Sequence, residues 1–501
     1  MQEYRPTLKE FLALSKKGNL IPVTREILAD LETPVSAFLK LGDNPYSYLL
    51  ESVEGGEKIA RYSFLGGSPS LVFKSKGRKV TLIYPGAKEE SFETKRDPLY
   101  ELEKILGRFK QAPVKGLPPF SGGAVGYLGY DTVRFIEKIP DKNKDVLNIP
   151  DTLFVFTDTL LIFDHVDKKI KIVSNVFLDN FKNPREAYLH ATEKIDQEIK
   201  KLRSFSGDRR LLAVAPASIN TALKVESNFK EDQFKSAVLK AKRYIKKGDI
   251  FQLVLSQRFK AQIHSEPFAI YRALRSINPS PYMFYLNCDG FHLVGASPEI
   301  HVKCENGKTA LRPIAGTRPR GKDTHEDSKL EKELLADPKE RAEHLMLVDL
   351  GRNDLGRVCE YKTVKVSEFM VVERYSHVMH IVSHVEGLLK KGKTIFDLLR
   401  ATFPAGTISG APKVRAMEII DQLENEKRSF YAGVVGYFGY SGNLDSCITI
   451  RTVLVKDGVA YAQAGAGIVA DSDPKKEFEE TVNKAKALLK AIECAEKGAL
   501  E

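Results

Sequence analysis

Apolar and polar residues alternate along this chain with the period of strands in some segments and of helices in others, and together these patterns predict a mixed α and β fold. Within residues 1–200, short β-rich runs alternate with turns that contain Gly and Pro; the clearest runs are Ser47–Ser52, Ser70–Phe73 and Leu153–Phe163. A polar helix is expected near Arg185–Arg203, and the following Ser204–Arg210 is interpreted as a linker or exposed loop.

The pattern sharpens from residue 226 onward. A helix is predicted by apolar residues at helical spacing ahead of a glycine stop, namely Phe234, Val238, Ala241, Ile245 and Gly248. The next run, Ile250–Phe259, is typical of a strand, and its period of two places on one face Gln252, Val254, Ser256 and Arg258. Polar side chains inside such a strand are candidates for the wall of a site.

One glycine-rich pattern occurs twice. Gly123–Tyr130 (GAVGYLGY) resembles Gly433–Tyr440 (GVVGYFGY). Glycine inside a strand permits a bulge or a close approach of another backbone. The echo indicates either an internal duplication or two strands that solve the same packing problem independently.

Two predicted helices begin alike, at Asp337-Pro338 and at Asp473-Pro474, each with Asp as N-cap and Pro in the first turn. Each helix then carries two glutamates three residues apart and so on one face, Glu340 with Glu343 and Glu477 with Glu480. Four carboxylates could converge on a hard cation such as Mg²⁺. The simpler interpretation is four surface charges, with Glu340 as a capping-box residue. The buried stripe of the second helix is expected at Phe478, Val482, Ala485, Leu489 and Ile492.

Other segments indicate a pocket for an anion. Ala464–Ile468 (AGAGI) follows a predicted strand and offers bare backbone N–H groups. Phe403–Lys413 is a Gly-rich turn before a helix, but it lacks the spacing of a nucleotide-binding P-loop. Arg451, in the predicted strand Cys447–Val455, could hold a carboxylate as a bidentate fork. The spacing of three histidines resembles that of metal ligands, but their apolar neighbours fit a strand equally well; they are His377, His380 and His384.

Composition narrows the class of protein. The 501 residues, with 43% apolar and 29% charged, predict two or more domains or one large composite, not a disordered chain. There is no apolar run of membrane-spanning length and no apolar signal core near the N-terminus, so a cytoplasmic protein without a membrane partner is expected. The cysteines lack CxxC spacing and are expected to be reduced thiols. The net charge of +11 comes from dispersed Lys and Arg, which favours a solvated surface over a nucleic-acid partner.

Residues 226–495 resemble the chorismate-binding enzymes throughout. Eight motifs occur in that family's order: Phe251–Phe259, Gly295–Glu299, Pro313–Gly321, Glu343–Asp354, His377–His380, Phe403–Lys413, Ala464–Ile468 and Glu477–Thr481. The N-terminal third resembles the large subunits of anthranilate synthases, notably at Leu49–Ser52. The resemblance implies an α/β fold of the α+β type, with large, mostly antiparallel sheets packed face to face and helices outside. It also implies an N-terminal regulatory domain, 1–205, and a chorismate-binding catalytic domain, 226–495.

The resemblance assigns the glutamates to a magnesium site. Glu343 and Glu480 match the Mg²⁺ ligands, and Glu340 and Glu477 match residues that support them through water. The cation would hold the ring carboxylate of chorismate.

The resemblance also implies the other roles. Glu299 matches the general acid, His380 matches the histidine associated with turnover of the ring intermediate, and Thr407 matches a substrate-contacting threonine. The remaining substrate contacts are expected from Gln252, Gly316, Thr317, Tyr431, Arg451, Gly465, Gly467 and Lys484.

Two positions separate the activities within the family. Members that use water carry Lys where Gln252 stands, and members that aminate carbon 4 typically carry Lys where Ala315 stands. Ammonia needs no general base, and a methyl group cannot attack carbon. The expected activity is therefore conversion of chorismate and ammonia to anthranilate and pyruvate in tryptophan biosynthesis, with 4-amino-4-deoxychorismate synthesis as the alternative.

A glutamine amidotransferase partner, and hence a hetero-oligomer, is expected because nothing in the chain resembles a glutamine-hydrolysing site. The resemblance further implies feedback inhibition by tryptophan, at a site formed by Glu51, Ser52, Pro281, Tyr282, Met283 and Cys447. A non-catalytic, amino-acid-sensing protein should lack Glu299, Glu343 or Glu480, all of which are present.

Overall fold

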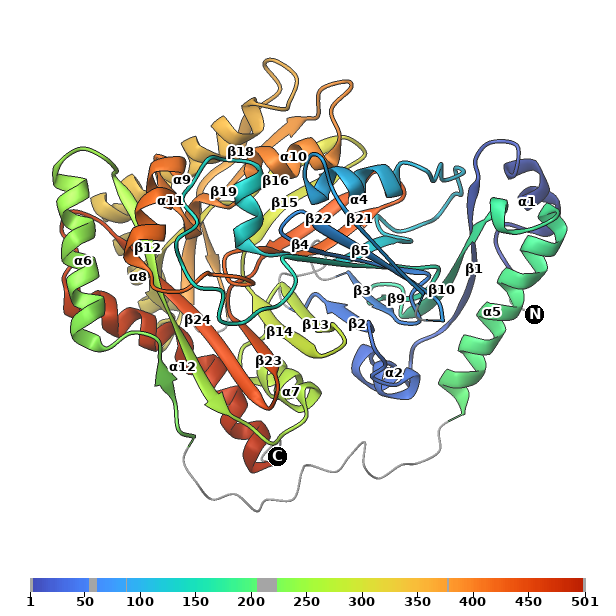
Figure 1. The fold of residues 1–501 in the computed structure, drawn as a ribbon, viewed down its shortest axis with the longest axis horizontal. Coiled ribbons are helices and arrows are strands. Elements are labelled where there is room, and N and C mark those ends of the chain that lie inside the picture. The colour runs from blue at the N-terminus through green and yellow to red at the C-terminus, as the bar shows by residue number, and fades with distance from the viewer. Residues whose placement is uncertain (1–2, 54–60, 87, 205–222, 376–377, 499–501) are drawn as a thin grey trace.

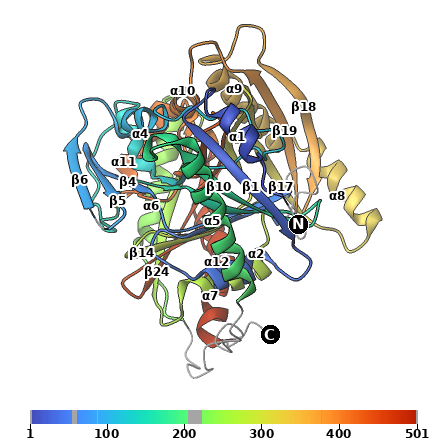
Figure 2. The same ribbon diagram turned by 90° about the vertical axis from the view of Figure 1, so that its right-hand side faces the viewer.

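Two twelve-stranded sheets form the centre of the molecule, and helices cover their outer sides (Figures 1 and 2). The computed structural model describes residues 3–53, 61–86, 88–204, 223–375 and 378–498. The neighbours along both sheets pair in antiparallel fashion, and the largest buried apolar cluster takes side chains from both sheets, for example Phe284 and Leu454 from one and Val125 and Phe438 from the other. The predicted fold class is confirmed.

The first sheet runs β1 (Leu20–Leu28), β10 (Lys169–Phe177), β9 (Thr159–Asp164), β3 (Tyr62–Gly66), β2 (Tyr48–Glu51), β13 (Tyr282–Asn287), β14 (Phe291–Ser297), β23 (Thr452–Lys456), β24 (Val459–Ile468), β12 (Gln252–Gln262) and β11 (Glu226–Ser227), with β20 (Gly410–Ala411) also on β12. The second runs β17 (Ile314–Pro319), β19 (Val378–Leu388), β16 (Lys308–Leu311), β15 (Ile300–Glu305), β22 (Leu444–Ile448), β21 (Val434–Gly439), β7 (Gly123–Leu128), β8 (Thr152–Thr157), β4 (Leu71–Lys76), β5 (Lys79–Tyr84) and β6 (Lys88–Glu93), with β18 (Lys365–Arg374) also on β19.

The helices lie around the outside of the sheets. On the right of Figure 1 lie α1 (Leu8–Leu14) and α5 (Pro184–Arg203), with α2 (Pro34–Leu41) lower and nearer the centre. The others are α4 (Pro98–Leu106), α6 (Glu231–Lys246), α7 (Pro267–Ile277), α8 (Thr324–Ala336), α9 (Pro338–Gly356), α10 (Ile395–Thr402), α11 (Lys413–Leu423) and α12 (Pro474–Lys497). The predicted helices near 185–203 and 234–245 are therefore present, and Gly248 adopts the positive φ of 80° that ends the second.

In each sheet, the strands on the two sides of the centre follow one another in corresponding chain order. In the first sheet, β2-β3-β9-β10-β1 on one side mirror β13-β14-β23-β24-β12 on the other. In the second, β7-β8-β4-β5-β6 mirror β21-β22-β15-β16-β19. The helices follow the same order along the chain, since α1, α2, α4 and α5 occupy the places that α6, α7, α10 and α12 occupy later.

The repeated glycine pattern lies on the central pair of the second sheet. β7 pairs with β21 so that Gly126 lies opposite Gly436. A Cβ atom at these two positions would lie 1.9 Å from the carbonyl oxygen of Leu153 and 2.2 Å from that of Asp445, so both strands need glycine for close backbone packing. The mirrored strand order extends this echo to the whole chain and favours internal duplication.

The predicted division into domains 1–205 and 226–495 stays a prediction. Both sheets contain strands from both ranges, so the two segments share one core. Residues 205–222, which include most of the predicted linker Ser204–Arg210, lie outside the described residues.

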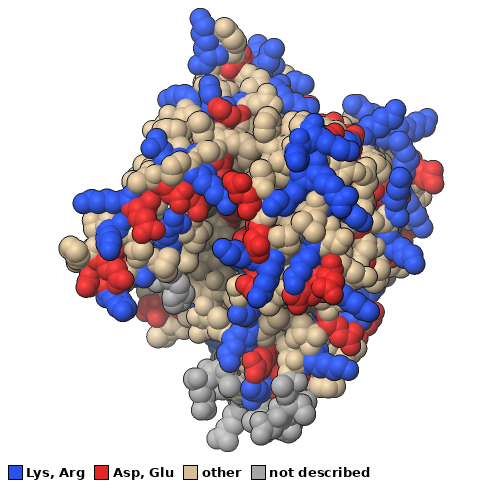
Figure 3. All heavy atoms as spheres, turned by 90° about the vertical axis from the view of Figure 1, so that its left-hand side faces the viewer, with Lys and Arg blue, Asp and Glu red and all other residues tan. Residues whose placement is uncertain are grey.

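Charged side chains of both signs share one face of the surface, and most of the cysteines lie inside the molecule. On the face seen in Figure 3, which carries α6, α8 and α9, basic and acidic side chains are interspersed. The five cysteines are free thiols, and four of them are buried. In the described ranges, every helix is too short or too polar to cross a membrane.

Candidate functional site

The site lies where two strands pass from one sheet to the other. β14 of the first sheet continues into β15 of the second through Glu299, and β22 of the second continues into β23 of the first through residues 449–451. Arg451 has a left-handed backbone there (φ 50°). The predicted single strand Cys447–Val455 is therefore wrong, because the chain turns between sheets in its middle. The N–H of Ile448 donates to the carbonyl oxygen of Glu299 over 3.0 Å and joins the two crossings.

Glu299 is a buried carboxyl with the properties of an acid at neutral pH. It is 9% exposed, and burial raises its pKa to about 8, although the nearby Thr407 hydroxyl and the charge of Lys484 lower it. Glu299 and Thr407, in the short turn Gly406–Ile408, line a cavity of about 40 Å³. The structure thus brings the predicted general acid and the predicted substrate-contacting threonine together.

His380 lies on β19 beside two other expected residues. Its Nδ1 is 3.0 Å from the carbonyl oxygen of Gly316 and 3.1 Å from the hydroxyl of Thr317. Because a carbonyl can only accept, Nδ1 carries the proton and Nε2 keeps its lone pair. Burial lowers the pKa of His380, and the charge of Arg451 lowers it further, so the ring is neutral.

The histidine spacing belongs to a strand. His384 follows His380 on β19 but lines a different, larger cavity, and His377 lies outside the described residues. Within the described residues, no three His, Cys, Asp or Glu side chains are grouped closely enough to hold a metal ion on their own.

Both glutamate helices begin as predicted. The carboxylate of Asp337 accepts from the N–H groups of Lys339 and Glu340, and that of Asp473 accepts from Lys475 and Lys476. Glu340 is not a capping-box residue, because its carboxylate is paired with Arg318 at 3.3 Å.

The glutamates are held in a partly desolvated setting. Burial raises the pKa of Glu343, and the neighbouring Glu340 raises it further, while an amide hydrogen bond from Gln252 at 3.1 Å lowers it. Burial and Glu480 likewise raise the pKa of Glu477. Buried carboxylates with a second carboxylate close by, as Glu343 has Glu340 and Glu477 has Glu480, fit a hard divalent cation, which completes its shell with water and substrate oxygens.

The buried face of α12 differs from the expected stripe. Ala485 and Ile492 are buried as predicted, but Phe478, Val482 and Leu489 are only partly covered, and Glu477 belongs to the buried face. The helix packs against β24, α7 and α6 together, so a wider arc of its surface is covered than one stripe. Glu477 lies within this covered arc.

Lys484 lies among the carboxylates of the site. Its Nζ is 2.6 Å from the carboxylate of Glu480 and 3.1 Å from the carbonyl oxygen of Gly465. Its charge lowers the pKa of three acids that come from three different elements, Glu299, Glu343 and Glu477. α9, α12 and the β14–β15 crossing therefore meet at one place.

Two glycines of β24 make room for side chains of the site. A Cβ atom at Gly465 would lie 2.8 Å from the hydroxyl of Tyr431, and one at Gly467 would lie 2.6 Å from Nε2 of Gln252. Burial raises the pKa of Tyr431 to about 12, so it stays a neutral donor. The Arg451 guanidinium donates to the backbone carbonyl of Lys484 at 2.6 Å.

Gln252 has a free acceptor. Its Nε2 is used by Glu343, but its buried Oε1 has no hydrogen-bond partner among the described residues. An unpaired buried acceptor is costly, so this oxygen suits a ligand that brings N–H or O–H groups.

A second, much larger cavity of about 1240 Å³ adjoins the site. All six residues expected at the tryptophan site line it: Glu51, Ser52, Pro281, Tyr282, Met283 and Cys447. β2 and β13 pair with Met283 opposite Glu51, which brings the two distant segments together. The Ser52 hydroxyl donates to the carbonyl oxygen of Pro281.

Glu51 is less available than the sequence indicates. Its buried carboxylate is paired with Arg275 at 3.0 Å and also accepts from the hydroxyl of Tyr271. Sequence reasoning missed both partners because they lie on α7, more than 200 residues away. It also missed Asp445, which accepts from Tyr282 at 3.0 Å and whose pKa burial raises to about 6.

The two cavities share a wall. Pro298 lines the large cavity, Glu299 lines the small one, and Ile300 lines both. A ligand in the large cavity therefore contacts the immediate neighbours of the buried acid.

Comparison with known proteins gives one family. A family model described as chorismate binding enzyme matches residues 47–490. Anthranilate synthase component 1 of Acetivibrio thermocellus is 51% identical over 493 residues, which cover 98% of this chain and 99% of that protein. The protein of the same name from Aquifex aeolicus is 50% identical, with 98% of each chain covered.

Comparison with solved structures gives the same family. The crystal structure of anthranilate synthase component I from Streptococcus pneumoniae matches with a TM-score of 0.77 and 35% identity, covering 92% of this chain and 99% of that one. MenF, the menaquinone-specific isochorismate synthase from Escherichia coli, matches with a TM-score of 0.69 but only 19% identity, which shows a common fold alone.

Proposed function

This chain belongs to the chorismate-binding enzyme family, and we propose that it converts chorismate and ammonia to anthranilate and pyruvate, as anthranilate synthase component 1 does in tryptophan biosynthesis. The observation that carries the proposal is the buried Glu299, whose pKa of about 8 keeps it protonated at neutral pH. The reaction expels a hydroxyl group from ring carbon 4, and hydroxide is a poor leaving group without an acid.

The first step joins ammonia to ring carbon 2. Glu299 donates its proton to the hydroxyl on carbon 4, which leaves as water, while the ammonia nitrogen forms its bond to carbon 2 and then gives up a proton. The free Oε1 of Gln252 is suited to accept an N–H of the incoming ammonia. A lysine at this position would favour water as nucleophile, and the neutral amide supports amination.

The second step forms the aromatic ring. A proton must leave carbon 2 as the bond to the enolpyruvyl oxygen breaks and pyruvate departs. Nε2 of His380 is a neutral acceptor, because Nδ1–H is fixed on the carbonyl oxygen of Gly316. His380 is therefore proposed as the group that takes this proton.

Glu343 and Glu480 would hold Mg²⁺, with Glu340 and Glu477 supporting it through water. When bound, the ion supplies the positive charge that fixes the ring carboxylate of chorismate. Tyr431, Arg451, Lys484 and the backbone at Gly465 and Gly467 would bind the enolpyruvyl carboxylate, and Gly316, Thr317 and Thr407 would border the ring.

One experiment tests the proposed function directly. The purified chain is incubated with chorismate, Mg²⁺ and an ammonium salt, and the isomer of the aminated product is identified by chromatography against standards. Anthranilate is expected. Formation of 4-amino-4-deoxychorismate would establish the alternative, and Ala315 argues against it because a methyl group cannot replace the lysine of that activity.

We further propose that a glutamine amidotransferase subunit supplies the ammonia, in a hetero-oligomer. The relatives' name, component 1, supports an enzyme of more than one subunit. The described cysteines support the same view, since Cys447 lies buried within β22 and burial raises its pKa, which makes it a poor nucleophile.

We also propose that tryptophan binds in the 1240 Å³ cavity as a feedback inhibitor. Pro281, Tyr282 and Met283 offer an apolar slot for an indole ring, and Ser52 and backbone carbonyls offer polar contacts. The shared wall at Pro298–Ile300 gives a physical route from this cavity to Glu299. Inhibition then requires only that tryptophan bind more tightly to a conformation in which the acid is displaced.

A further inference from the structure

The polar face of β12 continues beyond the residues that the proposed reaction uses. Ser256 and Arg258 share this face with Gln252, and they are only 1% and 4% exposed. Buried polar groups require partners. Ser256 donates from both its N–H (2.9 Å) and its hydroxyl (2.7 Å) to one oxygen of Glu424, which has a fully buried partner, Arg428.

Arg428 is among the largest fully buried side chains of the protein. Its Nε and Nη2 hold the two carboxylate oxygens of Glu424 at 2.9 and 2.7 Å. The rest of the guanidinium serves the backbone: Nη1 donates to the carbonyl oxygen of Ile408 at 2.7 Å, and Nη2 donates to that of Val254 at 2.7 Å. Glu424 thus neutralises the charge, and four of the five N–H groups of the guanidinium donate hydrogen bonds.

Both carbonyl groups belong to segments of the site. Ile408 directly follows Thr407, and Val254 lies two residues beyond Gln252 on β12 and pairs with Gly467. The guanidinium also lies over the ring of Tyr431, at 5.6 Å from its centre. One buried group therefore links three segments that carry expected substrate contacts, and nothing in its position requires it to touch substrate.

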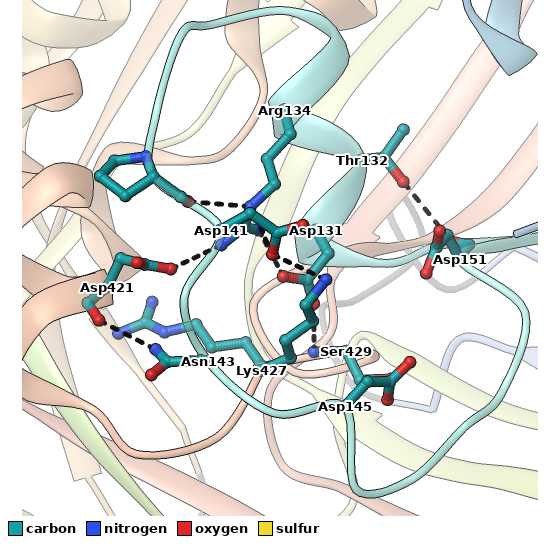
Figure 4. Close-up of polar contacts among 12 residues, drawn as sticks. Asp131, Thr132, Arg134, Asp141, Asn143, Asp145, Asp151, Asp421, Lys427 and Ser429 are labelled. Carbon is teal, nitrogen blue, oxygen red and sulfur yellow. Dashed lines mark hydrogen bonds and ion pairs between the residues drawn. The ribbon is translucent and has the colours of Figure 1, made fainter. Parts of the chain in front are cut away.

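The loop that carries Arg428 is fixed independently on its other side. Asp131 accepts from the N–H of Ser429 at 2.8 Å, and Arg134 pairs with Asp131 and, at 2.7 Å, with Asp421 (Figure 4). Lys427 pairs with Asp141 at 2.7 Å. Loss of the Arg428 contacts should therefore leave the loop backbone in place.

We propose that Arg428 is a positioning residue of the catalytic site, which sets the separation of the Thr407 turn, β12 and the ring of Tyr431. The inference rests on the proposed function. A buried ion pair adds little net stability compared with a well-packed neutral pair, but its fork fixes distances that a neutral pair does not. Displacement of catalytic groups by about 1 Å costs on the order of 100-fold in rate.

The experiment compares two conservative variants with the wild type. Arg428→Lys keeps the buried charge beside Glu424 but cannot reach both carbonyl groups at once. Its kcat for anthranilate from chorismate and ammonium should fall about 10- to 100-fold, with KM for chorismate changed far less. Arg400→Lys is the control, because Arg400 is also an arginine paired with carboxylates, Asp97 at 3.0 Å and Glu103 at 3.5 Å, and these partners lie on none of the three segments. Its kcat should stay near the wild-type value whatever thermal stability the change costs.

A second variant removes the charges as a pair. Glu424→Gln combined with Arg428→Gln leaves no unpaired buried charge, so the protein should fold and melt close to wild type while its kcat falls as in Arg428→Lys. The inference is overturned if either Arg428 variant turns over at the wild-type rate, or if both lysine variants lose activity in proportion to their melting temperatures. A wild-type chain that makes no anthranilate would instead refute the proposed function.

Discussion

Lys484 holds the carboxylate of Glu480 at 2.6 Å, one helical turn away on α12. Glu480 is also one of the two residues expected to bind Mg²⁺ directly. A cation at Glu480 would displace the lysine and free its ammonium group for a carboxylate of chorismate. Binding of Mg²⁺ and binding of chorismate are therefore expected to strengthen each other.

Glu343→Gln and Glu480→Gln should each lower anthranilate formation by ~100-fold or more, since loss of even an outer-shell partner of a metal costs 10- to 100-fold. Each change removes a charge but little volume, so the fold should persist. Activity is titrated with Mg²⁺ for each variant. Glu479→Gln is the matched control, because Glu479 is exposed on the same helix and pairs only loosely with Lys475 at 3.9 Å. Near wild-type activity of Glu343→Gln at low Mg²⁺ would refute the ligand assignment.

The acid role of Glu299 predicts a pH profile. The protonated form is the active one, so kcat measured at constant free ammonia should fall as pH rises through about 8. Glu299→Gln should lose most activity and, with it, this dependence. Holding the concentration of free ammonia constant matters because its own deprotonation raises the rate in the opposite direction.

The raised pKa of Glu299 also predicts how the stability of the fold depends on pH. The pKa of Glu299 is raised from 4.5 to about 8 in the folded state, so the unfolded state loses its proton first as pH rises. The stability contribution is fully present below pH 4.5 and is lost progressively up to about pH 8. Urea unfolding of Glu299→Gln at several pH values should show a flatter profile than that of wild type, and an identical slope would argue against the raised pKa.

Gln252→Leu tests the ammonia contact. The change removes the free Oε1 acceptor at similar volume, so KM for ammonium should rise about tenfold, the worth of one hydrogen bond. KM for chorismate serves as the internal control and should change less. If both constants rise together, Gln252 acts through Glu343, to which its Nε2 is bonded, and not on ammonia.

The amidotransferase proposal predicts which nitrogen source works. The chain alone should use ammonium salts, best at high pH where more of the ammonia is free, and should not use glutamine. Product formation is measured with each source before and after addition of a glutamine-hydrolysing subunit. Robust glutamine-dependent activity of the chain alone would contradict a separate partner.

Tryptophan should bind the large cavity with micromolar to low-millimolar affinity. Calorimetry with and without saturating chorismate and Mg²⁺ should show weaker binding in their presence, because coupling between two sites is reciprocal. Ser52→Phe should fill the indole slot and abolish inhibition while leaving turnover intact. A Ser52→Phe variant that remains fully inhibited would place the regulatory site elsewhere.

The sequence by itself determined the helix starts and the close-packed glycine strands, because each depends on residues that are neighbours in the chain. The Asp-Pro starts of α9 and α12 are caps, so they could be identified from the residues that form them. The repeated glycine pattern marked β7 and β21 in the same way, because close backbone packing excludes any side chain. The resemblance in the order of motifs then supplied the proposed roles of Glu299, Glu343 and His380.

Only the tertiary structure decided the protonation states and the contacts of these residues. The pKa of Glu299, the tautomer of His380 and the contact between Gln252 and Glu343 depend on burial and on partners far away in the chain. The continuous strand expected across Arg451 failed for the same reason, since a local pattern does not record that the chain leaves one sheet for the other. Nothing in the sequence indicated Arg428. Its proposed role depends on the carbonyl groups of Ile408 and Val254 and on the ring of Tyr431, which only folding brings within reach.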